Sequence, residues 1–409
     1  MRKTDAFRRA AALLAALSIT VSLAAPAFAG TYYIDKGNIT VIKNSDGTQT
    51  IKHGDKEETE KEGEEIIITT SNEATTTLES DLEGPAAEDS DFGPVVEDNY
   101  QPAAPAQPED ADQQESADRQ KDADQQEDAD QQKDADQQES ADQQAQPLQA
   151  APAPAASTPD FWHNTITVIN IFTDTVLNLT LKNVKIDVSD ADGKAALSVQ
   201  GDGNVTIELD GNNELKSGNL KAGLEKNTSE GTLTLKDDKE AGSGSLTAEG
   251  GGWAAGIGGS DGKGTNNIII SGGTVTAEGG NYGAGIGSGG GSYDGGDHIT
   301  ITGGTVNATG GAWGAGIGGG YGDDSDHITI TGGTVTAEGG NYGAGIGGGY
   351  GGVGDHITIG GGAVTAEGGE NGAGIGGGYS GVGDHITITG GKVTAEGGIS
   401  GAGIGGGYW

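Results

Sequence analysis

Residues 343–350 read Gly-Ala-Gly-Ile-Gly-Gly-Gly-Tyr, and this stretch recurs through the C-terminal part of the chain. Its isoleucine is found at six positions: Ile257, Ile286, Ile317, Ile346, Ile375 and Ile404. Successive positions are 29, 31, 29, 29 and 29 residues apart, and Leu224 is an earlier, degenerate member of the series. A fixed period of this length is typical of a solenoid in which each repeat forms one coil.

One full unit, residues 326–350, contains three segments in which apolar and polar residues alternate. The apolar members form three pairs: Ile328 and Ile330, Val335 and Ala337, and Ala344 and Ile346. The polar members face the other way: Thr329, Thr331, Thr334, Thr336 and Glu338. A period of two predicts strands, and the Gly-Gly pairs between them supply the positive φ of sharp corners. The sequence therefore predicts an all-β fold, a right-handed parallel β-helix with coils about 4.8 Å apart.

The same stretch also matches a dinucleotide-binding pattern, G-x-G-x-x-G, over residues 343–348. That pattern needs a strand before it and a helix after it. Here the pattern recurs in six coils with no helical periodicity nearby. We therefore interpret its glycines as corner residues of the solenoid and its Ala and Ile as core residues.

The N-terminal 29 residues have the organisation of a secretory signal. Four cationic side chains lie within residues 2–9, residues 10–25 are apolar, and Ala27-Phe28-Ala29 fits a cleavage site. The apolar run is short for a membrane span. We therefore expect cleavage after Ala29 and a secreted protein, extracellular or cell-wall associated, with no membrane span. The absence of cysteine excludes disulfides and thiolate metal sites.

The chain is strongly acidic, with a formal net charge of −39. The predicted signal contributes +3, so the remainder is near −42. Nucleic acid and acidic membrane surfaces need basic patches, which makes them unsuitable partners. The charge favours cations, or neutral or basic ligands.

Composition divides the rest of the chain into four parts. Residues 30–82 carry strand patterns around a hairpin turn and are expected to form a first coil or cap. Residues 83–160 are rich in Pro, Ala and Gln with acidic six-residue repeats, which predicts a disordered acidic linker. Residues 161–250 return to bulkier strand patterns and predict irregular N-terminal coils. Residues 251–409 hold the glycine-rich repeats.

A family resemblance follows from residues 203–211, from Ala222-Gly223-Leu224, and from the repeated Gly-Gly-Thr-Val-Thr-Ala-Glu-Gly-Gly. Together with the repeated glycine stretch, these resemble secreted carbohydrate-binding β-helix proteins of anaerobic bacteria, whose fold is like that of pectate lyases. The resemblance covers about 161–409. It implies binding of a polysaccharide or a host or cell-surface glycan, without indicating which one.

Aromatic side chains form two columns in the repeats. The first lies two residues before each repeat alanine: Trp253, Tyr282, Trp313 and Tyr342. The second lies four residues after the repeat isoleucine: Tyr321, Tyr350, Tyr379 and Tyr408. One interpretation is stacking at a corner of the fold. The other interpretation is that partly exposed rings pack against sugar rings. The candidate carbohydrate-binding residues are then the four of the first column together with Tyr321, Tyr350 and Tyr379.

Two further columns carry potential metal ligands. One consists of Asp-His pairs: Asp297-His298, Asp326-His327, Asp355-His356 and Asp384-His385. Each Asp precedes a strand, so we interpret it as a turn cap. The other is Glu249, Glu278, Glu338, Glu367 and Glu396, interrupted by Thr309. Stacked carboxylates repel by about 1 kcal/mol each in water, and Ca²⁺ would relieve this. Ca²⁺ is thus a candidate ligand, but no cofactor is predicted.

Catalytic groups are sparse. After the signal the only arginine is Arg119, in the predicted linker, and Lys263 and Lys392 lack a distinctive acidic cluster. Asp323-Asp324 resembles one fragment of a polygalacturonase site whose companion segments are missing. We therefore expect a non-catalytic protein. The alternatives are a surface adhesin or spacer with a protein partner, a polysaccharide lyase or hydrolase, and an ice-binding Thr array.

The chain stops partway through a repeat, at residues 405–409. An uncovered coil exposes unpaired backbone groups. We expect a fragment of a longer protein, end-to-end self-association, or a lid formed by Trp409, and we favour the first.

Overall fold

The computed structural model describes residues 30–60, 65–71, 161–227, 229–239, 242–292 and 296–409. The predicted signal and the predicted linker of residues 83–160, with Arg119, lie outside the described residues.

The described strands form three sheets, named here A, B and C. Sheet A contains, in spatial order, β1 (Gly30–Tyr33), β5 (Ile66–Thr69), β7 (Val176–Lys182), β10 (Asn204–Asp210), β13 (Leu233–Lys236), β16 (Thr265–Ile270), β19 (Gly296–Ile301), β22 (Ile328–Ile330), β25 (Thr358–Ile359) and β28 (Thr387–Ile388). Sheet B contains β4 (Lys56–Glu60), β3 (Gln49–His53), β2 (Ile39–Lys43), β6 (Ile166–Ile169), β9 (Leu197–Gln200), β12 (Leu224–Lys226), β15 (Ile257–Gly258), β18 (Ile286–Gly287), β21 (Ile317–Gly318), β24 (Ile346–Gly347), β27 (Ile375–Gly376) and β30 (Ile404–Gly405). Sheet C contains β8 (Lys185–Asp187), β11 (Asn212–Lys216), β14 (Ser245–Glu249), β17 (Thr274–Glu278), β20 (Thr305–Thr309), β23 (Thr334–Glu338), β26 (Ala363–Glu367) and β29 (Lys392–Glu396).

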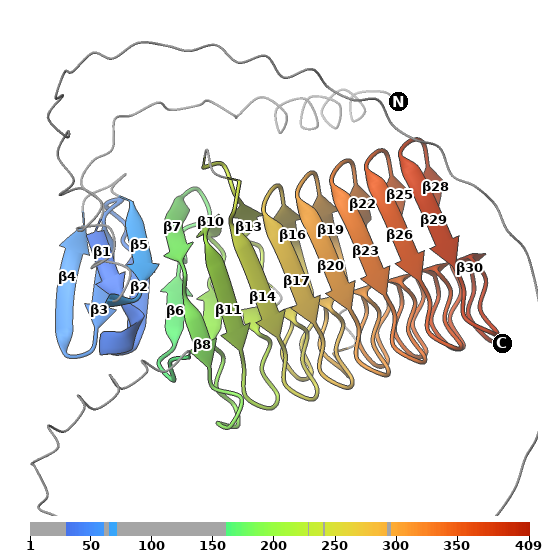
Figure 1. The fold of residues 1–409 in the computed structure, drawn as a ribbon, viewed down its shortest axis with the longest axis horizontal. Helices are drawn as coiled ribbons and strands as arrows, with labels where there is room; N and C mark the ends of the chain where they lie inside the picture. The colour runs from blue at the N-terminus through green and yellow to red at the C-terminus, as the bar shows by residue number, and fades with distance from the viewer. Residues whose placement is uncertain (1–29, 61–64, 72–160, 228, 240–241, 293–295) are drawn as a thin grey trace, which may run out of the picture. The chain divides into compact units, whose positions relative to one another are not determined.

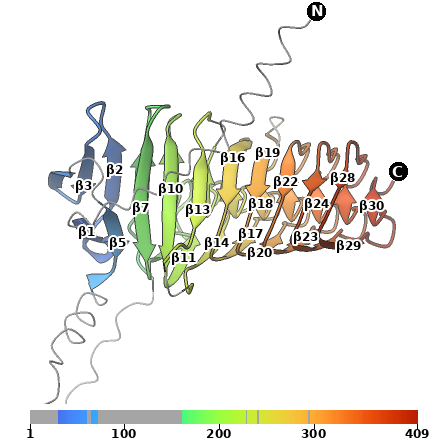
Figure 2. The ribbon, with the colours of Figure 1, turned by 90° about the horizontal axis from the view of Figure 1, so that it is seen from above.

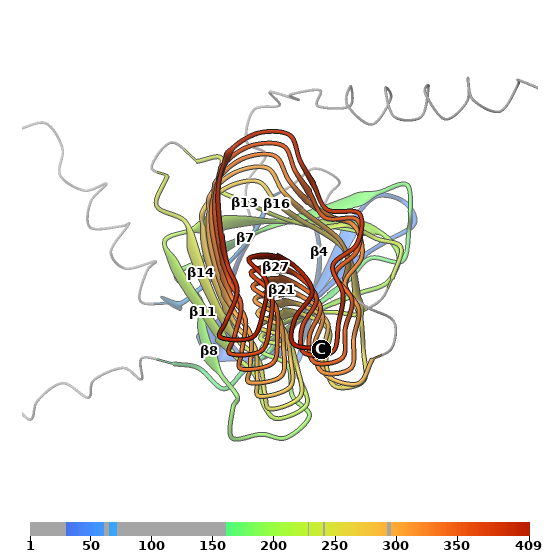
Figure 3. The same ribbon diagram turned by 90° about the vertical axis from the view of Figure 1, so that its right-hand side faces the viewer.

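From β6 onward the chain visits sheets B, A and C in turn, and each visit pairs in parallel with the previous coil. Strands β6, β7 and β8 make the first coil, and β27, β28 and β29 make the last complete one. The coils follow one another along the axis in Figures 1 and 2, and Figure 3 shows their three-sided course end on. The predicted all-β parallel solenoid is confirmed, with about eight turns.

The core consists of apolar ladders, as the alternation predicts. In sheet B, Ile317 pairs with Ile346, and in sheet C, Val306 pairs with Val335. All six inward members of the unit at 328–346 are buried, whereas Thr334 and Glu338 are exposed. Each buried isoleucine or valine contributes about 1.5–3 kcal/mol. Identical side chains in register thus hold neighbouring coils together.

Glycine sets the tight corners and the close approach of coils. Gly333, between sheets A and C, has a φ of 84°, which confirms the predicted left-handed corner. Gly347 in β24 has a φ of 134°, and a Cβ atom there would overlap the carbonyl oxygen of Gly376 in the next coil. A side chain at this position would therefore separate the coils.

The N-terminal segment extends the first coil. Strands β2 and β3 form the predicted antiparallel hairpin around the Asn44 turn, and a short 3-10 helix, η1 (Ile34–Lys36), precedes it. Strand β2 pairs in parallel with β6, and β5 with β7. Within the described ranges, no helix is long and apolar enough to cross a membrane. At the other end Trp409 is 89% exposed and does not form a lid.

Candidate functional site

The two aromatic columns lie in adjacent loops and are joined by their backbones. The first column lies in loops that lead from sheet C to sheet B, and the second in loops that lead from sheet B to sheet A. The amide of Tyr350 donates a 2.9 Å hydrogen bond to the carbonyl of Trp313, and Tyr379 donates to Tyr342 at 2.8 Å. We call the combined set the aromatic ridge: Trp253, Tyr282, Trp313, Tyr342, Tyr321, Tyr350, Tyr379 and Tyr408.

Within the ridge, rings stack along each column and meet edge to face between columns. Ring centroids are 4.3 Å apart between Trp313 and Tyr342, and 5.3 Å between Tyr321 and Tyr350. Across the columns, Trp313 meets Tyr350 at 5.0 Å with planes inclined by 72°. These are the favourable offset and T-shaped arrangements of aromatic pairs. The ridge is thus one packed unit rather than two independent rows.

This packing determines what a ligand can reach. Tyr350 has a parallel ring on each side, with centroids 5.3 Å and 5.1 Å away, so neighbours cover its faces. The ridge residues between Trp253 and Tyr379 are only half-buried, so each remains partly accessible to solvent. The hydroxyls of Tyr321, Tyr350 and Tyr379 make no hydrogen bond within the part of the chain that the structure describes. The stacked ring faces are therefore covered, whereas the three hydroxyls have no hydrogen-bond partner among the described residues.

The second column begins two coils after the first, because its position is occupied by Asp261 and then by Gly290 in the two preceding coils. Gly290 shows why an aromatic side chain is missing there. It occupies the coil position of Tyr321, but a Cβ atom there would lie 2.8 Å from the Cβ of Tyr282 and 3.1 Å from the Trp253 ring. Any side chain at 290 would displace the closest stacked pair of the ridge, Trp253 on Tyr282, whose centroids are 3.9 Å apart.

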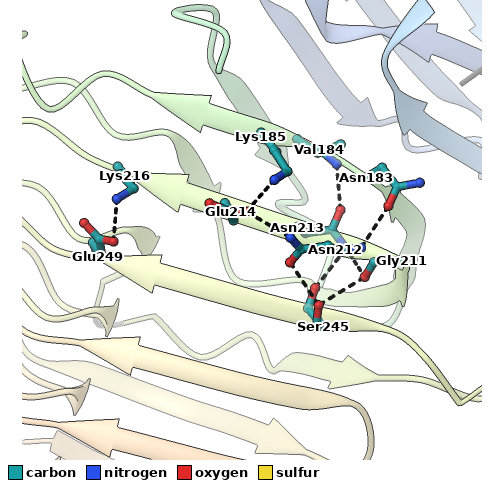
Figure 4. Close-up of polar contacts among 10 residues, drawn as sticks. All are labelled: Asn183, Val184, Lys185, Gly211, Asn212, Asn213, Glu214, Lys216, Ser245 and Glu249. Atoms are coloured by element: carbon teal, nitrogen blue, oxygen red, sulfur yellow. Dashed lines mark hydrogen bonds and ion pairs between the residues drawn. The ribbon is translucent and has the colours of Figure 1, made fainter. Parts of the chain in front are cut away.

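The glutamate column lies at the ends of the sheet C strands, in register from coil to coil. Glu338 pairs with Glu367, and Glu367 with Glu396. Its first member, Glu249, forms a 2.7 Å ion pair with Lys216 (Figure 4). Among the described residues, the groups that bring three potential ligand atoms within 4.8 Å of one another lie instead in the Asp-His column.

The Asp-His column lies at the start of strand β19 and just before strands β22, β25 and β28 of sheet A, with exposed histidine side chains. Nδ1 of His385 is 2.9 Å from Oδ1 of Asp355 in the preceding coil. This hydrogen bond, with the nearby carboxylates, raises the pKa of His385 above its ordinary value. Partial desolvation opposes the effect on Asp355, but the bonds from His385 and His356 hold its pKa below the usual range. The carboxylate and the imidazole are therefore coupled across coils.

The N-terminal coils contain buried polar groups that the sequence did not reveal. Asn213 is fully buried; its Oδ1 accepts from the Val184 amide at 2.9 Å, and its Nδ2 donates to the Ser245 carbonyl at 3.0 Å (Figure 4). Lys226 is 1% exposed and donates to Oγ of Ser229 at 2.6 Å. Burial lowers the pKa of Lys226 to about 8. These groups lie inside the fold, where they join neighbouring coils.

The carboxylates considered for catalysis also serve the fold. Asp323 is fully buried and accepts hydrogen bonds from the amide and hydroxyl of Ser292. Asp324 accepts from the Val353 amide at 2.8 Å. Two cavities, of about 490 and 330 Å³, lie elsewhere, one beside Tyr32 and His53 and one on sheet A beside Thr180 and Glu208. Neither is lined by the aromatic ridge or by Asp323.

Comparison with known families identifies the repeats. Five segments match the family model described as "Beta helix repeat": residues 268–290, 299–321, 328–350, 357–379 and 386–408. Each segment begins at a sheet A strand and ends at the second aromatic column or its Gly290 equivalent. No curated protein and no solved structure matches the chain.

Proposed function

Starting from a β-helix repeat protein of about eight coils, we propose that the chain is a secreted or cell-surface carbohydrate-binding protein without catalytic activity, and that the aromatic ridge is its binding surface. The observation that carries the proposal is the row of tyrosine hydroxyls on an ordered ridge, free of hydrogen bonds to the described residues. Binding in this way would attach the protein to a polysaccharide or a surface glycan.

The geometry suits a long neutral polymer. Centroids of the second column repeat at 5.3 and 5.1 Å, so an extended glycan would meet a hydroxyl at regular intervals. A phenol both donates and accepts hydrogen bonds, as sugar hydroxyls do. Because ring stacking and backbone bonds already hold the tyrosines, little side-chain entropy is lost on binding. The strong negative charge, −39 for the whole chain, favours neutral or basic glycans over uronate polymers.

Two features support the non-catalytic reading. Asp323, which belongs to the fragment that resembles part of a polygalacturonase site, is buried in a contact with Ser292. The five matched repeats are also nearly identical, which favours many equivalent contacts over one distinctive site.

The test separates hydroxyl contacts from ring packing. Tyr350→Phe combined with Tyr379→Phe removes two hydroxyls and keeps the stack. We expect a glycan array on the mature protein to identify a ligand, and calorimetry to show that the double variant binds it more weakly, by roughly fivefold per hydroxyl. Tyr33→Phe, in β1 and away from the ridge, is the matched control and should bind normally.

The harsher pair Trp313→Ala and Tyr342→Ala removes the rings and should weaken binding further. Its circular dichroism spectrum should remain that of a β-protein. Unchanged glycan affinity in a folded Phe double variant would contradict the ridge as the site. Absence of any glycan ligand, with capture of a surface protein instead, would favour the adhesin or spacer, and release of reducing sugar would favour an enzyme.

A further inference from the structure

The Asp-His column has a backbone conformation that does not itself require histidine. Its four histidines have left-handed φ angles: 57° at His298, 56° at His327, 46° at His356 and 45° at His385. One coil earlier the same position is Asn267, with a φ of 55°. Asparagine tolerates this region as well as histidine does. The left-handed backbone conformation therefore does not by itself explain why histidine stands at these four positions.

The imidazoles form a regular stack on the surface of the solenoid. Ring centroids are 4.8 Å apart between His298 and His327, 4.9 Å between His327 and His356, and 4.7 Å between His356 and His385. The planes are inclined by no more than 6°. The side chains of His327 and His356 are each 48% exposed, so solutes can reach them.

Carboxylates lie between successive imidazoles. Oδ1 of Asp326 is 2.9 Å from Nδ1 of His327 and 3.1 Å from Nδ1 of His356. Nδ1 of His356 is also 3.1 Å from Oδ2 of Asp355. A neutral imidazole carries at most one proton on Nδ1, so the two carboxylates compete for it. The arrangement concentrates lone pairs and negative charge at one point.

We infer that Asp326, His327 and His356, and in the next coil Asp355, His356 and His385, form two overlapping sites for a divalent transition-metal ion. In each group the three potential ligand atoms lie within 4.8 Å of one another. Two imidazole nitrogens and one carboxylate oxygen are the ligands of Zn²⁺ and Cu²⁺. Ca²⁺ prefers oxygen ligands alone and would suit the glutamate column instead.

The change needed for binding is small. A tetrahedral ion about 2.1 Å from each ligand needs ligand separations of about 3.4 Å. The Asp326 oxygen is already 2.9 and 3.1 Å from its two nitrogens, so mainly the imidazole pair must turn inward. Each imidazole would keep its proton on Nε2, which frees Nδ1 for the ion. Three protein ligands leave a coordination position open to water or to a ligand from solution.

Because both proposed metal sites contain His356, one substitution at this residue tests both of them. Mature chain without an affinity tag is titrated with Zn²⁺ alone and Cu²⁺ alone, by calorimetry and by electron paramagnetic resonance for Cu²⁺. We expect saturable binding, nitrogen hyperfine coupling from imidazole, and no competition from excess Ca²⁺. His356→Asn keeps a residue type that accepts the left-handed φ and removes a ligand from both sites. Affinity for Zn²⁺ should fall by at least about tenfold.

Two matched variants complete the experiment. His298→Asn alters the stack outside both sites, and Glu338→Gln alters the glutamate column, so both should retain Zn²⁺ affinity. Equal Zn²⁺ affinity in folded His356→Asn would overturn the proposal, as would displacement of Zn²⁺ by Ca²⁺ or no binding by the unmodified chain. No glycan is present in this titration, so its outcome is independent of the proposed carbohydrate binding.

Discussion

The coils of residues 161–250 and the repeats of residues 251–409 build the same three-sheet coil by different means. The N-terminal coils join their neighbours partly through side chains, as when Asn213 bonds to Val184 in one coil and Ser245 in another (Figure 4). The repeats use backbone bonds between glycines, such as the 2.9 Å bond from the Gly348 amide to the Gly376 carbonyl. One region is specified by individual contacts, and the other by repetition.

This difference determines where columns of aligned surface side chains can form. A contact such as that of Asn213 is single and internal, so the surface outside it varies from coil to coil. In the repeats the glycines remove side chains from the corners, and the residues that remain outside align in columns. The aromatic ridge and the Asp-His column both arise in this way, because each side chain stacks on its equivalent one coil away.

The largest contrast is expected at one position of sheet B. Gly347 is in register, through successive coils, with Glu225 and Ser198 of the irregular region. Gly347→Ala places a Cβ against the carbonyl of Gly376 at a φ of 134°, so we expect a loss of about 4 kcal/mol in the free energy of unfolding. Ser198→Ala should lose only about 1 kcal/mol, mainly its hydrogen bonds. Urea denaturation measures the loss of unfolding free energy in both variants. Equal losses would contradict the claim that the two regions join their coils in different ways.

Prediction from sequence succeeded where the chain repeats itself. The period placed Ile346 and Ala344 inside and Thr334 and Glu338 outside, because in a solenoid each coil has nearly the same surroundings as the next. It also located the glycine corner at Gly333.

The repeat period does not predict contacts between different parts of a coil. The period cannot show that Tyr350 meets Trp313, because they come from two loops whose approach depends on how the corners fold. It likewise could not show that Asp326 lies between two imidazoles. Asn213 occupies an inward position, in register with Leu246, and is fully buried. Its polar side chain predicts exposure instead, so the alternation of polar and apolar residues does not identify it as a core residue.

An exchange of residues within one ladder sharpens the comparison further. Asn213 is in register, coil by coil, with Val335. Val335→Asn buries an amide between Val306 and Val364, which offer no polar partner, and should cost about 3 kcal/mol of unfolding free energy. Asn213→Val leaves the Val184 amide and the Ser245 carbonyl without the side chain and should cost about 2 kcal/mol. Denaturant titration measures both changes. If it shows that Asn213→Val is more stable than the unmodified protein, the buried amide is not what holds those coils together.

The smallest expected effect concerns Lys226, whose counterpart positions in the repeats carry no charge. The buried amine releases its proton near pH 8, whereas the unfolded chain holds it up to about pH 10.5. Between these values the unfolded state binds more protons, so the free energy of unfolding should rise with pH.

From pH 7 to pH 10 this rise in the free energy of unfolding amounts to roughly 2 kcal/mol. Above pH 10 the trend should reverse, because burial beside Glu60 raises the pKa of Tyr32 and the unfolded chain then loses that proton first. Lys226→Met keeps most of the side-chain volume and removes the titrating amine, so its stability should be nearly constant over the same interval. Denaturation midpoints of the two proteins at matched ionic strength measure the difference. Parallel pH profiles would mean that the four oxygens around Nζ, from Asn227, Ser229 and Asn266, keep the buried amine charged.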